Sequence, residues 1–319
     1  MDQLLLRRIG IGVGVFVLTT LLFLLIGEKE ALVVGIITGA AYGLLGLGLV
    51  LIYKSSGVFN FAQGEFGTVA IYALYLLHSS GVPYFFAILG ALVVAILFGL
   101  LVERVIVRPL FDAPRVTLLV ATAGVSLLAV GVEIWFGEAR LRNIDPAFPR
   151  TDRLSLLGVR ISDQRLLLIV VLIVLAGVLA YFFNRTNLGL AILGASQEPT
   201  ATELVGISVR RLSSFTWALA ALLGGLAGVI GIPAGGNTFG PGVVTSALLI
   251  PAFTAAVLGG FTSLPGAFLG GAIVGVSQSL ATSADFFDFI PGQAGTVIAF
   301  VLLVGVLSVR PNGLLGGKA

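Results

Sequence analysis

Apolar residues in this chain gather in long runs rather than in the alternating pattern of a strand or the one-sided pattern of a surface helix. A helix that crosses a bilayer needs about 20 mostly apolar residues, and ten runs approach or reach that length. Because Gly or Pro interrupts several of them, the pattern predicts eight to ten membrane segments, at least one of them a discontinuous helix. The expected fold is an all-α, polytopic transmembrane helical bundle. The runs are Ile9–Ile26, Ala31–Tyr53, Phe61–His78, Tyr84–Val107, Val116–Phe136, Leu166–Asn184, Ser213–Ile232, Val244–Phe261, Pro265–Ser283 and Gly292–Val309.

The composition gives the same answer and excludes several functions. Hydrophobic residues make up 58% of the chain and charged residues 10%, whereas a soluble domain carries about 25% charged residues. Membrane lipid is therefore an expected partner, and a net charge of +3 gives no basic patch for nucleic acid. With no cysteine and only His78, we expect no metal site. The absence of a G-x-x-x-x-G-K-[ST] loop and of a plausible catalytic set predicts that the chain is not an enzyme.

The distribution of Lys and Arg predicts the orientation. If all ten runs cross, more of these residues fall on the side of the N-terminus than on the opposite side, which predicts that both termini are cytoplasmic. We expect one transmembrane domain over residues 1–319, with an extracytoplasmic cap at 137–164 and a cytoplasmic loop at 185–212. Within that loop Glu198–Leu204 can form a short helix with Pro199 in its first turn. From the pattern alone, both connections could equally be ordinary solvated loops.

The segment Tyr53–Phe66 places polar groups between two apolar runs that are too close together for a normal loop. Ionisable groups at membrane depth are costly and usually face a cavity or a partner, and transporters use broken helices to line a path. One interpretation is a discontinuous helix whose Asn60, Gln63 and Glu65 line a translocation path. The alternative is a tight cytoplasmic turn in which Glu65 pairs with Lys54 and stabilises a helix N-terminus.

Glycine is abundant, with 43 residues in the chain, and several glycines recur at four-residue spacing. This spacing lets membrane helices approach each other closely and mostly indicates internal packing. A second interrupted run, Pro251–Gly271, contains two prolines and paired glycines. The spaced glycines are Gly35, Gly39 and Gly43, then Gly224 and Gly228, then Gly266 and Gly270.

Four ordered motifs are familiar. The run from Gly43 to Glu65, GLLGLGLVLIYKSSGVFNFAQGE, closely resembles the signature of the branched-chain amino acid ABC transporter permeases of the LivH type. Glu103–Leu110, ERVIVRPL, resembles the family's E-R-x-x-x-R-P-L loop. Thr254–Gly271 and the ending Arg310–Gly316 resemble its C-terminal half. Within the first motif, Gln63 stands where the family commonly has His.

This resemblance implies an importer of the cell (inner) membrane built from several subunits. Its partners would be a paralogous LivM-like permease or a second copy of this chain, two cytoplasmic ABC ATPases and an extracytoplasmic substrate-binding protein. ATP and Mg would be bound by the ATPases, with no cofactor in this chain. In the family, a coupling helix docks into the ATPase. The matching stretch of this chain is Gly189–Ile207. The coupling candidates are Ser196, Gln197, Glu198, Thr200, Glu203 and Leu204.

The function expected is alternating-access import of branched-chain or other hydrophobic amino acids. Phe59, Asn60 and Gln63 would line the path, with Glu65 as a further candidate, and residues 137–164 and 231–243 would dock the binding protein. Importers of urea, amides and aromatic acids resemble the same pattern, so these substrates stay open. From a different class, an ion-coupled carrier or channel that uses Glu65 is the alternative. A scaffold subunit with few substrate contacts is a third.

Overall fold

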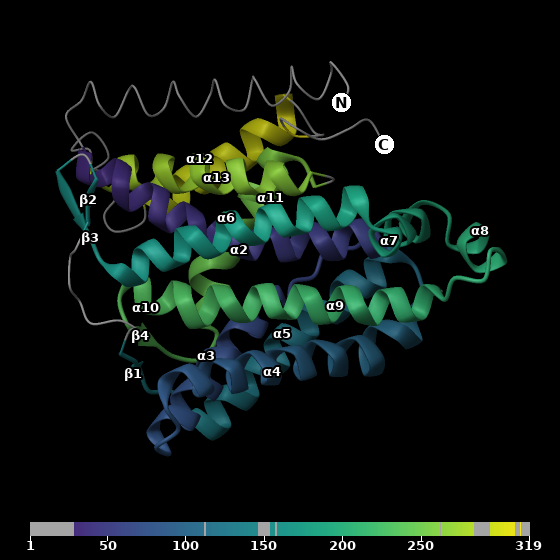
Figure 1. Cartoon of the computed structure of the whole chain (residues 1–319), viewed down its shortest axis with the longest axis horizontal. Coiled ribbons are helices and arrows are strands. Elements are labelled where there is room, and N and C mark those ends of the chain that lie inside the picture. The colour runs from purple at the N-terminus through teal and green to yellow at the C-terminus, as the bar shows by residue number, and fades with distance from the viewer. Residues whose placement is uncertain are drawn as a thin grey trace. The chain divides into compact units, whose positions relative to one another are not determined.

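The structure, a computed structural model, describes residues 29–111, 113–145, 154–156, 158–261, 263–283, 294–309 and 313 (Figure 1). The predicted run Ile9–Ile26 lies outside these residues. The main helices are α2 (Lys29–Ser56), α3 (Gln63–Ser79), α4 (Tyr84–Val102), α5 (Arg115–Gly137), α6 (Asp163–Arg185), α7 (Asn187–Gln197), α8 (Pro199–Leu204), α9 (Val209–Leu226), α10 (Ile232–Gly235), α11 (Ile250–Gly259), α12 (Leu264–Ser283) and α13 (Ala294–Val309).

Each predicted run from Ala31 onward is mostly helical over its described residues. Among those residues, six helices are long and apolar enough to cross a membrane, and two shorter apolar helices accompany them. The chain is therefore a mostly helical, polytopic membrane protein. The six are Lys29–Ser56, Tyr84–Leu110, Arg115–Gly137, Asp163–Arg185, Val209–Gly235 and Leu264–Ser283, and the shorter two are Thr245–Gly259 and Ala294–Ser308.

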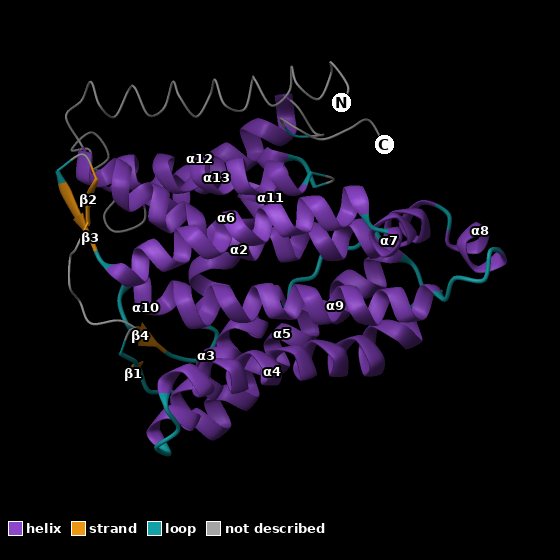
Figure 2. Cartoon of the chain, in the orientation of Figure 1, coloured by secondary structure: helices purple, strands orange, loops and turns teal. Residues whose placement is uncertain are grey.

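Two antiparallel ribbons depart from the all-α expectation (Figure 2). In one, β1 (Arg142–Asn143) pairs with β4 (Thr238–Phe239). In the other, β2 (Leu154–Leu156) pairs with β3 (Val159–Ile161). These strands are too short to show a period-two pattern in the sequence, so the helical periodicity on either side of them gave no sign of them.

The chain divides into two compact units. The first contains residues up to Leu47, Phe148–Ala176 and Ile250 onward, and the second contains Gly48–Ala147 and Gly177–Leu249. In the first unit α11, α12 and α13 pack together. The interrupted run Pro251–Gly271 is a helical hairpin there, in which Gly260 turns the chain with a φ of 89°.

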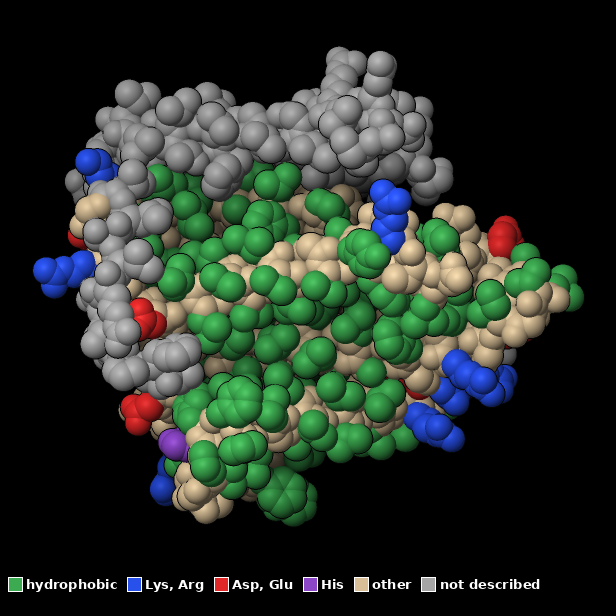
Figure 3. Space-filling model, in the orientation of Figure 1, with side chains coloured by type: hydrophobic (Ala, Val, Ile, Leu, Met, Phe, Trp, Pro, Cys, Tyr) green, Lys and Arg blue, Asp and Glu red, His purple; other side chains and the backbone are tan. Residues whose placement is uncertain are grey.

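In the second unit α3, α4 and α9 pack together, and α4 shows how membrane helices reverse the soluble pattern. Its buried face is a narrow stripe of small residues, namely Ala87, Ala91, Ala95 and Gly99. Large apolar side chains such as Phe85 point outward and are 66% exposed. A helix in lipid gains nothing by hiding large apolar groups, so small residues face the neighbouring helices and allow close contact. Figure 3 shows hydrophobic side chains over most of the described face, with Lys and Arg near helix ends.

The spaced glycines make the close contacts that the sequence predicts. In the first unit a Cβ on Gly39 would meet Gly271, and one on Gly266 would collide with Gly259. In the second unit a Cβ on Gly228 would collide with the carbonyl oxygen of Gly67. The helices carrying these pairs approach backbone to backbone, which no residue larger than Gly permits.

Gly228→Val should therefore destabilise the protein strongly. Overpacking costs about 1–3 kcal/mol, and here the colliding atom is a backbone oxygen that cannot rotate away. Gly131→Val is the matched control, because Gly131 also lies within a membrane helix but has no atom within 4 Å of its would-be Cβ. Thermal unfolding in detergent should show a lower midpoint for the Gly228 variant alone. Equal midpoints would contradict the close packing of α3 against Ala227–Gly231.

Candidate functional site

The polar segment after α2 is a break in the helical chain. The helix α2 ends at Ser56, and Gly57 adopts a φ of 67° that favours glycine. The Gly57 N–H still donates to the Tyr53 carbonyl at 2.8 Å, which closes the last turn. The chain then runs without helix until α3 begins at Gln63. The side chain of Asn60 prepares that start, because its Oδ1 accepts a hydrogen bond from the Ala62 N–H at 3.0 Å.

Asn60 and Gln63 lock this break to a neighbouring helix. They are 1% and 0% exposed, and Asn60 Nδ2 donates to Gln63 Oε1 at 3.5 Å. Gln63 Nε2 donates to the Ala220 carbonyl of α9 at 2.9 Å. The amide of Gln63 also lies directly over Gly48, where a Cβ would collide with it. A buried amide that bonds a backbone carbonyl of a membrane helix costs much to withdraw, so we call this pair the Asn60–Gln63 lock.

Phe59 and its neighbours are held by α5. The Phe59 ring stacks on Tyr53 with centroids 4.9 Å apart. The hydroxyl oxygen of Thr122 accepts from the Phe61 N–H at 3.2 Å, and its hydrogen is shared between the carbonyls of Leu119 at 2.9 Å and Phe59 at 3.4 Å. Because backbone groups freed by a broken helix need partners inside a membrane, Thr122 explains how an irregular backbone is tolerated here.

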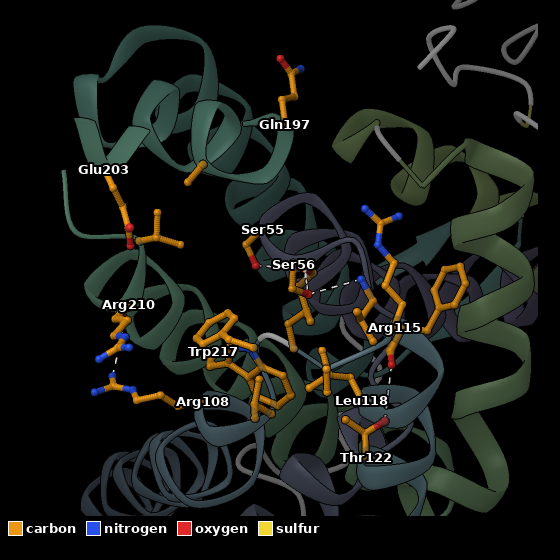
Figure 4. A pocket seen from close by; sticks show the side chains of 18 of the residues that line it. Ser55, Ser56, Arg108, Arg115, Leu118, Thr122, Gln197, Glu203, Arg210 and Trp217 are labelled. Atoms are coloured by element: carbon orange, nitrogen blue, oxygen red, sulfur yellow. Dashed lines mark hydrogen bonds between the residues drawn. The ribbon is translucent and has the colours of Figure 1, made fainter. Parts of the chain in front are cut away.

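A cavity of about 490 Å³ lies beside the break (Figure 4). Its volume is in the range of sites for small ligands. Of the four path candidates named from the sequence, only Phe59 lines it, whereas Asn60, Gln63 and Glu65 do not. Its lining residues are Ile52, Ser55, Ser56, Val58, Phe59, Val107, Arg108, Phe111, Ala113, Arg115, Leu118, Thr122, Ala195, Gln197, Thr200, Glu203, Val209, Arg210 and Trp217.

The charges on the cavity wall are mostly positive. Arg108, Arg115 and Arg210 line it, and Glu203 is the one acidic residue among the lining residues. The Arg115 guanidinium lies against the break, with Cζ 3.4 Å from a would-be Cβ on Gly57. Figure 4 shows these side chains around the same space as Trp217. A cavity with apolar walls and several guanidinium groups is suited to a small molecule that carries a carboxylate.

An ion pair in the segment after α4 is tied to α9 by Ser214 beside this cavity. Glu103 is 1% exposed, and its Oε2 lies 3.2 Å from Arg108 Nη2. The Ser214 hydroxyl of α9 donates to the same Glu103 oxygen at 2.9 Å, and Arg108 Nη2 donates to the Ser214 hydroxyl oxygen at 2.6 Å. We call these three residues the Glu103–Arg108–Ser214 clamp. The ERVIVRPL motif in the sequence contains Glu103 and Arg108, but it did not indicate that they form an ion pair beside the cavity.

The predicted short helix is present as α8. Glu198 precedes it and Pro199 occupies its first turn, as expected from the sequence. The Thr202 hydroxyl bonds back to the Glu198 carbonyl at 3.0 Å. At its end Leu204 and Val205 are 84% and 74% exposed. These two apolar side chains have almost no packing within the described chain.

The coupling candidates divide between two surroundings. Gln197, Thr200 and Glu203 line the cavity, so the structure brings them together with Phe59. Glu198 lies between α7 and α8, and Leu204 points outward. Ser196 belongs to α7. The sequence treated the path and the coupling stretch as separate, but in the structure they border one space.

Glu65 is buried and does not pair with Lys54 through any ion pair among the described residues. Its Oε1 accepts a hydrogen bond from Ser126 of α5 at 3.0 Å. Its carboxyl group lies within hydrogen-bonding reach of Glu133, a residue that reasoning from the sequence did not single out. An acidic residue inside the apolar run Val116–Phe136 was the available signal.

Broken helices beside a cavity in a helical membrane bundle are typical of solute-transport proteins. Residues 31–307 match the family described as branched-chain amino acid transport system / permease component, and the chain belongs to this family. It is thus the membrane permease of an ABC transport system and carries no ATPase domain.

Two curated relatives support this assignment. The high-affinity branched-chain amino acid transport system permease protein BraD of Pseudomonas aeruginosa is 33% identical, over 90% of this chain and 95% of BraD. The corresponding permease protein LivH of Escherichia coli K12 is 27% identical, over 88% of this chain and 93% of LivH. Among solved structures, PsaBC from Streptococcus pneumoniae matches with a TM-score of 0.46 and 13% identity, over 89% and 92% of the two chains. That likeness is too low to carry an argument.

Proposed function

We propose that this permease imports branched-chain and other hydrophobic amino acids by alternating access, driven by ATPase subunits bound in trans. The observation that carries the proposal is the cavity, because the helix break, the Glu103–Arg108–Ser214 clamp and the segment around α8 all border it. Two cytoplasmic ATPases would bind ATP and Mg, an extracytoplasmic binding protein would deliver substrate, and a LivM-like permease or a second copy would complete the pore. If ten segments cross the membrane, the distribution of Lys and Arg favours both termini in the cytoplasm.

The cavity is the cytoplasmic end of the path in this proposal. The positive-inside rule puts its arginines on the cytoplasmic side, and the Asn60–Gln63 lock closes the path above it. In an inward-facing state, substrate would leave this cavity to the cytoplasm. The apolar wall residues Ile52, Val58 and Leu118 suit an aliphatic side chain, and Arg115 suits its carboxylate.

The segment around α8 would carry the signal from the ATPases. Leu204 and Val205 are neighbouring exposed apolar side chains in a loop expected to face water, and a docked ATPase would remove both from water. Movement of α8 would reach the path directly, because Thr200 and Glu203 share the cavity with Phe59. The family description and the names of BraD and LivH favour branched-chain amino acids as the substrate class.

The lock itself predicts a transport defect. Gln63→Leu removes the hydrogen bond to Ala220 and leaves Asn60 Nδ2 unpaired, so we expect leucine uptake to fall about tenfold, as for the loss of a buried hydrogen bond worth about 1–2 kcal/mol. Gln278→Leu is the matched control, because Gln278 is also buried and donates to a backbone carbonyl, that of Gly295, at 2.9 Å. Equal uptake by the two variants would place Gln63 off the path.

Reconstitution of the whole transporter tests the function. The permease, its candidate ATPases and the binding protein are placed in proteoliposomes, and ATP-driven uptake of leucine, isoleucine, valine, phenylalanine and urea is measured. ATP-dependent uptake of leucine, isoleucine and valine supports the proposal. Uptake by this chain alone under a proton gradient would overturn it in favour of an ion-coupled carrier.

A further inference from the structure

Glu65 and Glu133 form a buried carboxyl pair in the second unit, apart from the cavity. Glu65 is 0% exposed and Glu133 is 7% exposed. Each has one oxygen already satisfied, since Ser126 donates to Glu65 Oε1 at 3.0 Å and the Gly242 N–H donates to Glu133 Oε2 at 2.8 Å. The two carboxyl groups lie within hydrogen-bonding reach of each other. The remaining oxygens, Glu65 Oε2 and Glu133 Oε1, have no hydrogen-bond partner among the described residues.

Buried polar atoms without partners concentrate around this pair. Of the eight such side-chain atoms in the described part of the chain, five belong to residues in this region. Besides the two carboxyl oxygens they are Tyr72 Oη, Arg142 Nε and Thr245 Oγ1. The hydroxyl groups of Thr245 and Thr68 lie within hydrogen-bonding reach of the Glu65 carboxyl group. Tyr72 interacts electrostatically with both Glu133 and Arg142, and Arg142 Nη2 donates to the Gly137 carbonyl at 3.0 Å. Native proteins satisfy nearly all buried polar atoms, and a group of exceptions at one place requires an explanation.

The arrangement of these atoms matches a zwitterion. The unsatisfied acceptors are two carboxyl oxygens, which suit an ammonium group, and the unsatisfied donors Tyr72 Oη–H and Arg142 Nε–H suit a carboxylate. Buried carboxyl groups at membrane depth are costly unless a cation pairs with them. Within the described residues, no Lys or Arg forms an ion pair with either glutamate.

We propose that Glu65 and Glu133 bind the α-ammonium group of the transported amino acid, and that Tyr72 and Arg142 receive its carboxylate. This inference rests on the proposed function and names a second substrate site. The site would allow the permease to distinguish an amino acid from a simple hydrocarbon acid.

The helix α5 sets this site apart from the cavity. Thr122 lines the cavity and holds the break, Ser126 binds Glu65, and Glu133 follows near the end of the helix. At 1.5 Å per residue, Ser126 and Glu133 lie about 6 and 17 Å along the axis from Thr122. The Asn60–Gln63 lock is at the level of Thr122, so the zwitterion site lies beyond the lock. Substrate would occupy it before the lock opens toward the cavity.

A single shared proton is the competing occupant, because one proton between the two free oxygens would also satisfy both. The two occupants respond differently to glutamine. A Gln side chain imitates a protonated carboxyl group, so Glu133→Gln keeps a proton-like bridge to Glu65 but removes one of the charges that an ammonium group needs.

Direct leucine binding separates these outcomes. Radiolabelled leucine binding to the purified transporter in nanodiscs, without the binding protein, is compared for wild type, Glu65→Gln and Glu133→Gln. Glu138→Gln is the control, since Glu138 is exposed and pairs only with exposed Arg140. We expect each buried-site variant to raise the Kd for leucine at least tenfold and the control to leave it unchanged. Tyr72→Phe should weaken binding of leucine more than binding of leucinol, which keeps the ammonium group and lacks the carboxylate.

Two results would overturn the inference. One is that Glu133→Gln binds leucine as the wild type does while its uptake no longer depends on pH. That result would show that the carboxyl pair holds a shared proton and not the ammonium group. The other is a wild-type transporter that imports leucine in proteoliposomes but shows no leucine binding that depends on Glu65. In both cases the uptake by the wild type keeps the proposed function intact, whereas absence of any amino acid uptake would refute that function first.

Discussion

Replacing Leu204 with Asp is expected to abolish ATP-driven leucine uptake while leaving the fold of the permease unchanged. Leu204 is 84% exposed at the end of α8, so the substitution removes almost no packing within the chain. If α8 docks into an ATPase, however, the new carboxylate must lose its water at the centre of that contact. Anchors of this kind contribute about 2–4 kcal/mol to association, which corresponds to a loss of affinity of roughly 30-fold or more.

Co-purification of the ATPases with tagged permease measures this directly, with uptake as the second readout. Leu141→Asp is the matched control, because Leu141 is 78% exposed but belongs to the segment between α5 and β1. It should retain the ATPases at the wild-type level. Normal ATPase recovery with Leu204→Asp would remove α8 from the contact and require another docking element.

The sequence predicted the membrane helices well because the relevant signal is local. The length of a membrane helix can be read directly from its run of apolar residues. The spaced glycines of α2, α9 and α12 indicate a close helix contact even when the partner helix is unknown. The short helix α8 was also predictable, because Pro199 at a first turn needs no tertiary information. For the same reason the break at residues 57–62 was visible as a polar interruption.

The partners within the site could not be predicted. The amide of Gln63 donates to the carbonyl of Ala220, which is 157 residues away in the sequence. Glu65 lies beside Glu133, which belongs to a different apolar run. The packing of the whole unit decides which helices are neighbours. A single sequence does not show these neighbours. The grouping of Phe59 with Gln197 and Glu203 around one cavity was missed for this reason.

The Glu103–Arg108 contact was missed for a geometric reason. Residues five apart on an α-helix point about 140° away from each other, so the motif did not indicate an ion pair. In the structure Glu103–Val107 forms a π-helical turn. Hydrogen bonds to the fifth residue widen that turn and bring the two side chains to the same side. Such turns are common at functional sites, and this one lies at the cavity.

Glu103→Gln should be the most damaging single substitution in this region. It leaves the Arg108 guanidinium, which is 26% exposed, without its carboxylate and leaves the Ser214 hydroxyl without a charged acceptor. Removing one partner of a buried ion pair costs about 3 kcal/mol or more. We therefore expect a clearly lower unfolding midpoint in detergent, together with loss of uptake, because the clamp ties α4 to the start of α9.

The second ion pair of the described residues provides the control. Arg140 and Glu138 lie 3.0 Å apart, but their side chains are 79% and 64% exposed. Water screens such a pair, and its loss costs at most about 1 kcal/mol. Glu138→Gln should thus leave the unfolding midpoint close to that of the wild type. If the two variants unfold at the same midpoint, the clamp does not hold α4 to α9.

The double variant Glu103→Leu, Arg108→Leu separates the two roles of the clamp. Replacing both members of a buried ion pair by apolar residues is often neutral for stability, so most of the lost midpoint should return. Uptake should not return, because leucine cannot hold Ser214 or present a positive charge to the cavity. Recovery of uptake together with stability would show that the ion pair serves the fold alone and has no part in transport.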